Sequence, residues 1–273
     1  MPDSAFHVHC GLALGVVTAA PLCAQESQPS AAVPTSDGVV LVADAIAWHD
    51  PDGVWQRRAV EMRWQTTYAG KTAPSTDVRL RFGGGPETFT MAGTMAEHDV
   101  HYTVRDGKAR VTVDGEEEVG QEVTDAMALG RENGLLWQNY YRFLAGMPMN
   151  LVEGTAVIAP AVVETEFGGE PARAVTVTFR GGGHTYVVYF AKDEPQLIGT
   201  LFYAKQESDG ETIEFDGLVE GDGLRLPARR TWYYTENRKL LGSDTVSEVR
   251  APAAATSPPT SHPTSQPTSR RTR

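Results

Sequence analysis

Cysteine is almost absent from this sequence of 273 residues, which contains only Cys10 and Cys23. Both lie in the apolar stretch at the N-terminus, so the remainder of the chain can form no disulfide, no thiolate nucleophile and no cysteine-ligated metal site. The fold must therefore be stabilised by the burial of apolar side chains and by backbone hydrogen bonds.

Positive charge is also scarce, because 24 lysines and arginines face 35 aspartates and glutamates, for a formal net charge of −11. Residues 1–24 contribute −1 through Asp3, and residues 252–273 contribute +3 through three arginines, so the residues between them carry −13. A surface this acidic repels phosphate backbones. We therefore expect no nucleic-acid partner.

A long apolar run is missing as well. The longest, Cys10–Leu22, is shorter than the roughly 20 residues that a membrane-spanning helix needs. Its small residues and the polar residues after Ala24 are typical of a cleaved signal peptide over residues 1–24. The stretch before it lacks lysine and arginine, so a retained N-terminus or a lipid anchor at Cys23 stays as the alternative. We expect an exported protein of the periplasm or cell envelope, monomeric and without a transmembrane segment in its mature form.

Two further segments hold too few apolar side chains to offset the entropy of ordering. Residues 25–36 are rich in serine, proline, alanine and glutamine and predict a flexible linker. Residues 252–273 repeat Pro-Thr-Ser and predict a disordered tail. Residues 37–251 remain, a length that suits a single domain with a sizeable core.

Short strands separated by turn residues dominate this central region, and Arg105-Asp106-Gly107-Lys108 is the clearest two-residue hairpin. Strands are expected at residues 54–68, 77–82, 88–92, 100–105, 108–113, 157–166, 172–179, 185–191, 196–206, 212–220, 224–234 and 240–249. Helical spacing of apolar residues predicts helices at residues 39–49, 119–129 and 135–145, the first ending before Pro51. Closely spaced strands pair antiparallel, and a dozen in one sheet must curl. The sequence thus predicts an α+β fold, a strongly curved antiparallel sheet (a half-barrel) wrapped on a short helical block.

Three sequence blocks carry a family resemblance: AIAWHDPDGVW at residues 45–55, QNYYRFLAGMPMNL at 138–151, and RTWYY at 230–234 with LGSD at 241–244. In this order they resemble the uncharacterised domain-of-unknown-function family 6503 of exported bacterial proteins. The resemblance covers most of the chain from residue 42 to residue 246. It implies an architecture similar to the lipoprotein carriers LolA and LolB, a half-barrel covered by helices and open to an acyl chain. It implies no reaction and no catalytic residue.

Candidate catalytic groups are few, since the folded region lacks the Gly-x-Ser-x-Gly motif of a serine nucleophile. His98 and His101 are three residues apart on an expected strand, so they point to opposite faces. His49, Asp50 and Asp52 have the chemistry to bind a metal or relay a proton, yet a histidine in the last helical turn before Asp-Pro-Asp-Gly is also ordinary turn chemistry. We predict no catalytic residue, no metal ligand and no cofactor.

Aromatic side chains concentrate in the three blocks. Most are expected in the core, but some can line a concave apolar pocket between helix 135–145 and the sheet, with methionines as an adaptable rim. The predicted ligand-binding residues are Trp48, Trp64, Trp137, Tyr140, Tyr141, Met147, Met149 and Trp232.

The leading functional hypothesis is an exported, non-enzymatic binding protein for an apolar or amphipathic, lipid-like small molecule. One alternative is a metal-dependent hydrolase built on His49, Asp50 and Asp52. The other is a structural module of the envelope without a ligand, which an interior filled by side chains beneath the helix would favour.

Overall fold

The computed structural model describes residues 36–71, 76–83, 88–117, 119–127, 129 and 136–251. The predicted signal peptide, nearly all of the linker and the predicted tail lie outside these residues. None of the helices in the described part of the chain is long and apolar enough to cross a membrane.

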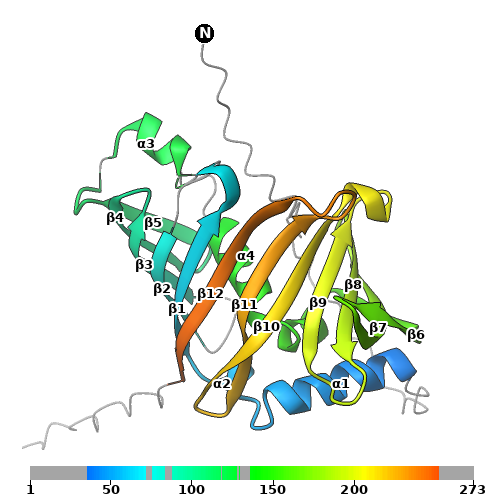
Figure 1. Ribbon diagram of the computed structural model, residues 1–273. Helices are drawn as coiled ribbons and strands as arrows, with labels where there is room; N and C mark the ends of the chain where they lie inside the picture. The colour runs from blue at the N-terminus through cyan, green and yellow to red at the C-terminus, as the bar shows by residue number, and fades with distance from the viewer. Residues whose placement is uncertain are drawn as a thin grey trace, which may run out of the picture.

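Twelve strands and a few short helices make up the fold (Figure 1). The strands are β1 (Val60–Tyr68), β2 (Thr76–Phe82), β3 (Thr88–Met95), β4 (His98–Arg105), β5 (Lys108–Val113), β6 (Ala156–Phe167), β7 (Glu170–Phe179), β8 (Thr185–Ala191), β9 (Leu197–Tyr203), β10 (Glu211–Gly221), β11 (Leu224–Tyr234) and β12 (Leu240–Arg250). The α-helices are α1 (Asp37–His49), α2 (Val54–Arg57), α3 (Gln121–Ala126) and α4 (Leu136–Gly146). Short 3₁₀ turns are η1 (Ala69–Lys71), η3 (Met149–Val152) and η4 (Glu207–Asp209).

All twelve strands belong to one sheet, in the order β5-β4-β3-β2-β1-β12-β11-β10-β9-β8-β7-β6. Sequence neighbours pair as antiparallel hairpins, while β1 pairs with β12, so that Trp64 lies opposite Val246. The two ends of the folded region are thereby joined in the middle of the sheet, and β5 and β6 are its open edges. The fold class is as predicted, an open, strongly curved antiparallel sheet.

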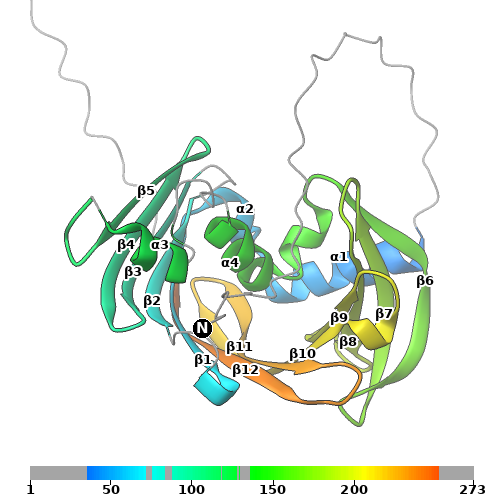
Figure 2. The same cartoon turned by 90° about the horizontal axis from the view of Figure 1, so that it is seen from above.

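The sheet bends into a U, and the chain between β5 and β6 crosses its concave side as α4 (Figure 2). At one end of the strands, α1 packs against β6 and β11 (Figure 1). Helix α4 of the predicted helical block is therefore sheltered by the sheet, whereas α3 has no buried residue. Helix α1 covers the end of the sheet opposite to the β11–β12 turn (Figure 1).

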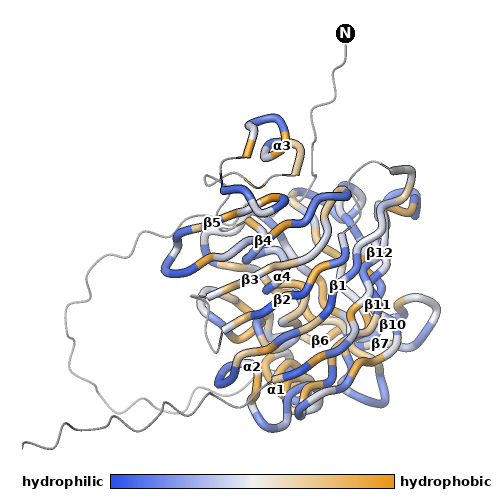
Figure 3. Tube along the Cα trace, turned by 90° about the vertical axis from the view of Figure 1, so that its left-hand side faces the viewer, coloured by the Kyte–Doolittle hydropathy of each residue, from blue (hydrophilic) through white to orange (hydrophobic). Residues whose placement is uncertain are grey.

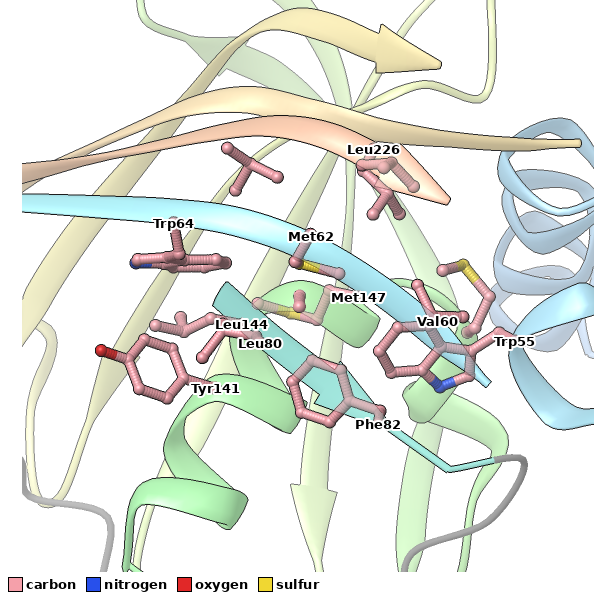
Figure 4. Packing of buried hydrophobic residues seen from close by; sticks show 14 of the residues in the cluster. Trp55, Val60, Met62, Trp64, Leu80, Phe82, Tyr141, Leu144, Met147 and Leu226 are labelled. Atoms are coloured by element: carbon pink, nitrogen blue, oxygen red, sulfur yellow. The ribbon is translucent and has the colours of Figure 1, made fainter. Parts of the chain in front are cut away.

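Alternation along the strands explains which face is buried. In β2, for example, Val78, Leu80 and Phe82 are buried and the residues between them are more exposed, the period of two that a sheet with one covered face requires. Figure 3 shows this alternation as repeated changes between hydrophobic and hydrophilic residues along the Cα trace. Apolar residues of β1 and β2 meet those of α4 in a dense core (Figure 4).

The segment Val54–Arg57 corrects the predicted strand at residues 54–68, because it forms α2 and the strand starts only at Val60. Asp50 provides the reason. Its Oδ1 accepts a hydrogen bond from the backbone N–H of Val54 (2.6 Å) and its Oδ2 accepts one from Trp55 (2.9 Å), so it satisfies two N–H groups that a helix start leaves free.

Three other local predictions are confirmed. Helix α1 ends at His49, before Pro51, and the β4–β5 turn has positive φ at both Asp106 and Gly107 (51° and 70°), as a primed hairpin turn requires. His98 is partly buried and His101 is exposed, on opposite sides of β4.

Candidate functional site

Helix α4 buries Trp137, Tyr141 and Leu144, which recur at helical spacing, against the concave face of the sheet. The ring of Tyr141 lies 5.3 Å from that of Trp64 in an edge-to-face contact. Figure 4 shows Trp64, Tyr141, Leu144 and Met147 together in this core. The space directly beneath α4 is therefore filled by side chains.

The three sequence blocks that carry the family resemblance meet around this helix. Gly146 at the end of α4 lies against the indole of Trp55, where a Cβ would come within 2.5 Å of the ring. The guanidinium of Arg142 lies 5.5 Å from the centre of the same ring. From the third block, Arg230 donates a hydrogen bond from Nη2 to the backbone oxygen of Leu144 (3.0 Å).

Two charged residues are buried in the middle of the concave face. Arg230 on β11 and Asp244 on β12 are opposite each other in the register, with 0% and 1% of their surfaces exposed. Burial lowers the pKa of Arg230 to about 10, so it stays a cation at neutral pH, and its guanidinium lies 4.6 Å from the ring of Trp64. Burial raises the pKa of Asp244, and hydrogen bonds from Thr66 and Trp232 work against that rise.

A relay of hydrogen bonds holds the carboxyl group of Asp244. The indole N–H of Trp64 donates to the hydroxyl of Thr66 (3.2 Å), and this hydroxyl donates to Oδ1 of Asp244 (2.7 Å). The indole N–H of Trp232 donates to the other oxygen, Oδ2 (2.9 Å). Buried polar groups satisfied in this way fix side-chain positions, and here they fix the two tryptophans that flank α4.

Toward the end of the sheet that lies opposite α1, aromatic rings continue from α4 across the concave face. Tyr140 stacks with Trp232 at 6.3 Å, Trp232 meets Phe202 at 6.3 Å, Phe202 meets Tyr186 at 5.8 Å, and Tyr186 meets Phe143 at 5.1 Å. We call these five residues the aromatic row. Tyr186 is buried, whereas the other four are only partly buried, so the row presents apolar ring surface to solvent.

Glu211 stands at the end of this row. It is the first residue of β10 and lies directly opposite Phe202 of β9 and Tyr234 of β11, so these three side chains share the concave face. Its carboxyl group is partly buried, and burial raises its pKa to about 7. Among the described residues, this carboxyl group has no hydrogen-bond or ion-pair partner.

The structure separates the predicted ligand-binding residues into two groups. The larger group is buried in the core and consists of Trp64, Trp137, Tyr141, Met147 and Met149. The smaller group is partly exposed and consists of Trp48, Tyr140 and Trp232. Trp48 lies on α1 beneath the guanidinium of Arg225 (5.1 Å), away from the other two. Of these three partly exposed residues, Tyr140 and Trp232 stack on each other.

Phe202, Tyr186 and Glu211 were not among the residues predicted from the sequence. Period-two alternation contained a signal for Glu211, because it has the same parity on β10 as the buried Ile213 and Phe215. The expected strand began one residue later, at residue 212, and so left Glu211 in the preceding turn.

His49 joins three segments of the fold. Its Nδ1 donates to the backbone oxygen of Arg225 (2.5 Å), and its Nε2 accepts from the backbone N–H of Leu197 (3.0 Å), which defines the neutral tautomer. Burial lowers the pKa of this fully buried imidazole to about 4. Both ring nitrogens are therefore engaged, and neither is free to bind a metal or accept a proton from a substrate.

The two neighbouring acids, Asp50 and Asp52, do not form a site with His49 either. Asp50 caps α2, and Asp52 lies on the exposed turn that follows α1. Within the described ranges no group of three histidine, cysteine or acidic side chains is arranged to hold a metal ion.

Comparison with protein-family models gives no match, and comparison with curated proteins gives none either. Among solved structures, a LolA superfamily protein from Nitrosomonas europaea is 10% identical, with a TM-score of 0.48, over 80% of this chain and 94% of that one. A DUF1329 family protein from Desulfovibrio piger is 11% identical, with a TM-score of 0.45, over 81% of this chain and 96% of that one. At these identities and TM-scores neither similarity assigns a family or a ligand to this chain, and the resemblance to family 6503 stays a prediction.

Proposed function

We propose that this chain is an exported, non-enzymatic protein that binds an apolar or amphipathic, lipid-like small molecule in the cell envelope. The observation that supports the proposal is the aromatic row, where Tyr140, Phe143, Phe202 and Trp232 leave ring surface exposed on the concave face. Apolar surface removed from water stabilises a complex by about 25 cal/mol per Å². A monomeric protein that exposes contiguous apolar surface commonly uses it for binding.

The location of the row also suits a binding site. Hydrogen bonds to buried groups fix the position of its rings. The indole N–H of Trp232 donates to Asp244, and Arg230 donates to the backbone oxygen of Leu144 on α4. Rigid aromatic side chains lose little entropy when a ligand covers them. We infer that the ligand lies along the row with its apolar part over Phe202 and Trp232.

Replacing Phe202 by alanine tests the proposal. We expect Phe202→Ala to weaken the binding of dodecanol, a neutral amphiphile, by about tenfold, because removal of the ring reduces the apolar area that contacts the alkyl chain. Calorimetric titration below the aggregation limit of the alcohol measures this change. The matched control is Tyr203→Ala, which removes an aromatic ring from the next residue of β9 on the opposite face. Equal affinities of the two variants would contradict this location, and a wild-type protein that binds no amphiphile would contradict the function.

A structural envelope module without a ligand is the second candidate, and one observation favours it. The interior beneath α4 is filled by Trp64, Tyr141, Leu144 and Met147, all at most 1% exposed. Native mass spectrometry of the protein purified from its own envelope separates the candidates, because a structural module carries no small molecule.

A further inference from the structure

The register places the acidic residue Glu211 on the concave face between Phe202 and Tyr234, whereas the other acid of this face, Asp244, is held by Thr66 and Trp232. The ring contact between Trp232 and Phe202 passes over β10, the strand that begins with Glu211. Tyr234 beside it is 37% exposed. The carboxyl group therefore lies at the solvent-facing end of the proposed binding surface, where the polar end of an amphiphile would lie.

This carboxyl group lacks the partner that other acids of the same region have. On the opposite face of the same strand, Glu214 pairs with Arg238 (2.5 Å). For Glu211 the described residues supply no such cation, and burial is the cause of its raised pKa. A partly buried acid without a partner costs folding free energy. Such a cost is typical of a residue retained for binding.

The titratable groups around Glu211 leave this position open to a cation. His184 lies next to Phe202, at 6.1 Å between rings, and Tyr186 is buried beneath them. Arg238, on the turn after β11, is held by Glu214 and lies 4.1 Å from the ring of Tyr233 on the other face. Lys239 on the same turn is exposed to solvent.

We propose that the ligand carries a cationic ammonium group, which pairs with Glu211 while its apolar chain lies on the aromatic row. This inference rests on the proposed function and specifies the ligand class. Aromatic ring faces attract cations, and Phe202, Tyr234 and Trp232 share the concave face with Glu211, the first two directly opposite it in the register. The net charge of −11 of the chain favours the approach of a cation over that of a fatty acid.

Three probes that share one alkyl chain test the proposal: dodecyltrimethylammonium, dodecanol and dodecanoate, titrated below their aggregation limits. At about pH 8, where Glu211 is ionised, we expect the ammonium probe to bind about tenfold more tightly than dodecanol, and dodecanoate to bind most weakly. At about pH 5 the preference for the ammonium probe over dodecanol should disappear, because Glu211 is then protonated.

The variant Glu211→Gln should remove the roughly tenfold preference for the ammonium probe over dodecanol at about pH 8, because the amide carries no charge. The matched control is Glu214→Gln, on the same strand but the opposite face, which should keep the preference. Circular dichroism at the same pH verifies that both variants are folded. If wild type and Glu211→Gln bind the three probes alike, the ammonium proposal is overturned while the proposed function stands. If wild type binds none of the probes, both are overturned.

Discussion

Replacement of Arg230 by methionine is expected to lower the free energy of unfolding by about 3–5 kcal/mol, the range seen when a buried charge that compensates another group is removed. Methionine fills much of the volume but donates no hydrogen bond. The backbone oxygens of Leu144 and Pro227 accept hydrogen bonds from the guanidinium at 3.0 and 3.1 Å. In the variant both oxygens would be buried without a hydrogen-bond donor. Asp244 would also lose the nearby positive charge. Urea denaturation measures the change.

Two further variants distinguish the loss of charge from the loss of packing. Arg229→Met changes the same residue type one position earlier, on the exposed face of β11, and should alter stability by less than about 0.5 kcal/mol. The double variant Arg230→Met/Asp244→Asn should recover part of the loss, because it no longer buries an uncompensated acid. A loss below about 1 kcal/mol for Arg230→Met would refute the view that this cation ties α4 to the sheet.

Acid should destabilise the fold through His49. The pKa of this residue is about 4 in the folded state and 6.5 in the reference state. Between these two pH values the unfolded chain binds a proton at His49 that the folded protein does not bind. The contribution of the neutral His49 to the free energy of unfolding is therefore complete above pH 6.5 and is lost as the pH falls toward 4. The full shift corresponds to about 3 kcal/mol at 1.36 kcal/mol per pKa unit. His49→Ala should remove this pH dependence and lower stability at neutral pH, because Arg225 and Leu197 lose their buried partner.

Glu211 acts in the opposite direction and would partly mask this effect. Its pKa is raised from 4.5 to about 7 in the folded state. Its contribution to the free energy of unfolding is therefore present below pH 4.5 and is lost as the pH rises toward 7. The measurement therefore belongs in the Glu211→Gln background, by urea denaturation between about pH 4 and pH 7. His101→Ala, at an exposed position of β4, is the control that should leave the profile unchanged. If the free energy of unfolding of the Glu211→Gln variant, with His49 intact, did not change between about pH 4 and pH 7, a buried neutral imidazole at His49 would be ruled out.

Local signals in the sequence predicted most of the secondary structure correctly. Turn residues and two-residue alternation located the strands to within a few positions, because turn geometry and the exposure of alternate side chains depend on neighbours in the chain. The hairpin at Asp106-Gly107 needs positive φ that these residues adopt readily. The same reasoning failed at Val54–Arg57, where the capping bonds from Asp50 outweigh the strand propensity of Val54 and Trp55.

The ligand-binding residues predicted from aromatic content stay a prediction, and most of them differ from the residues of the proposed binding surface. Trp64, Trp137 and Tyr141 were predicted to bind a ligand, and the structure places them in the core, while Phe202 and Glu211 on the concave surface were not considered. Composition cannot distinguish a buried aromatic ring from a partly exposed one, because exposure depends on what packs against the ring.

The amino-acid order alone was thus enough to indicate an acidic protein with a sheet of about a dozen antiparallel strands and one aromatic helix. It did not indicate that β1 would pair with β12, that Arg230 would reach Leu144, or that Glu211 would stand unpaired beside Phe202. Local backbone preferences act over a few residues, whereas these contacts join positions far apart in the chain. They form only when the whole sheet curves around α4 and buries its concave face.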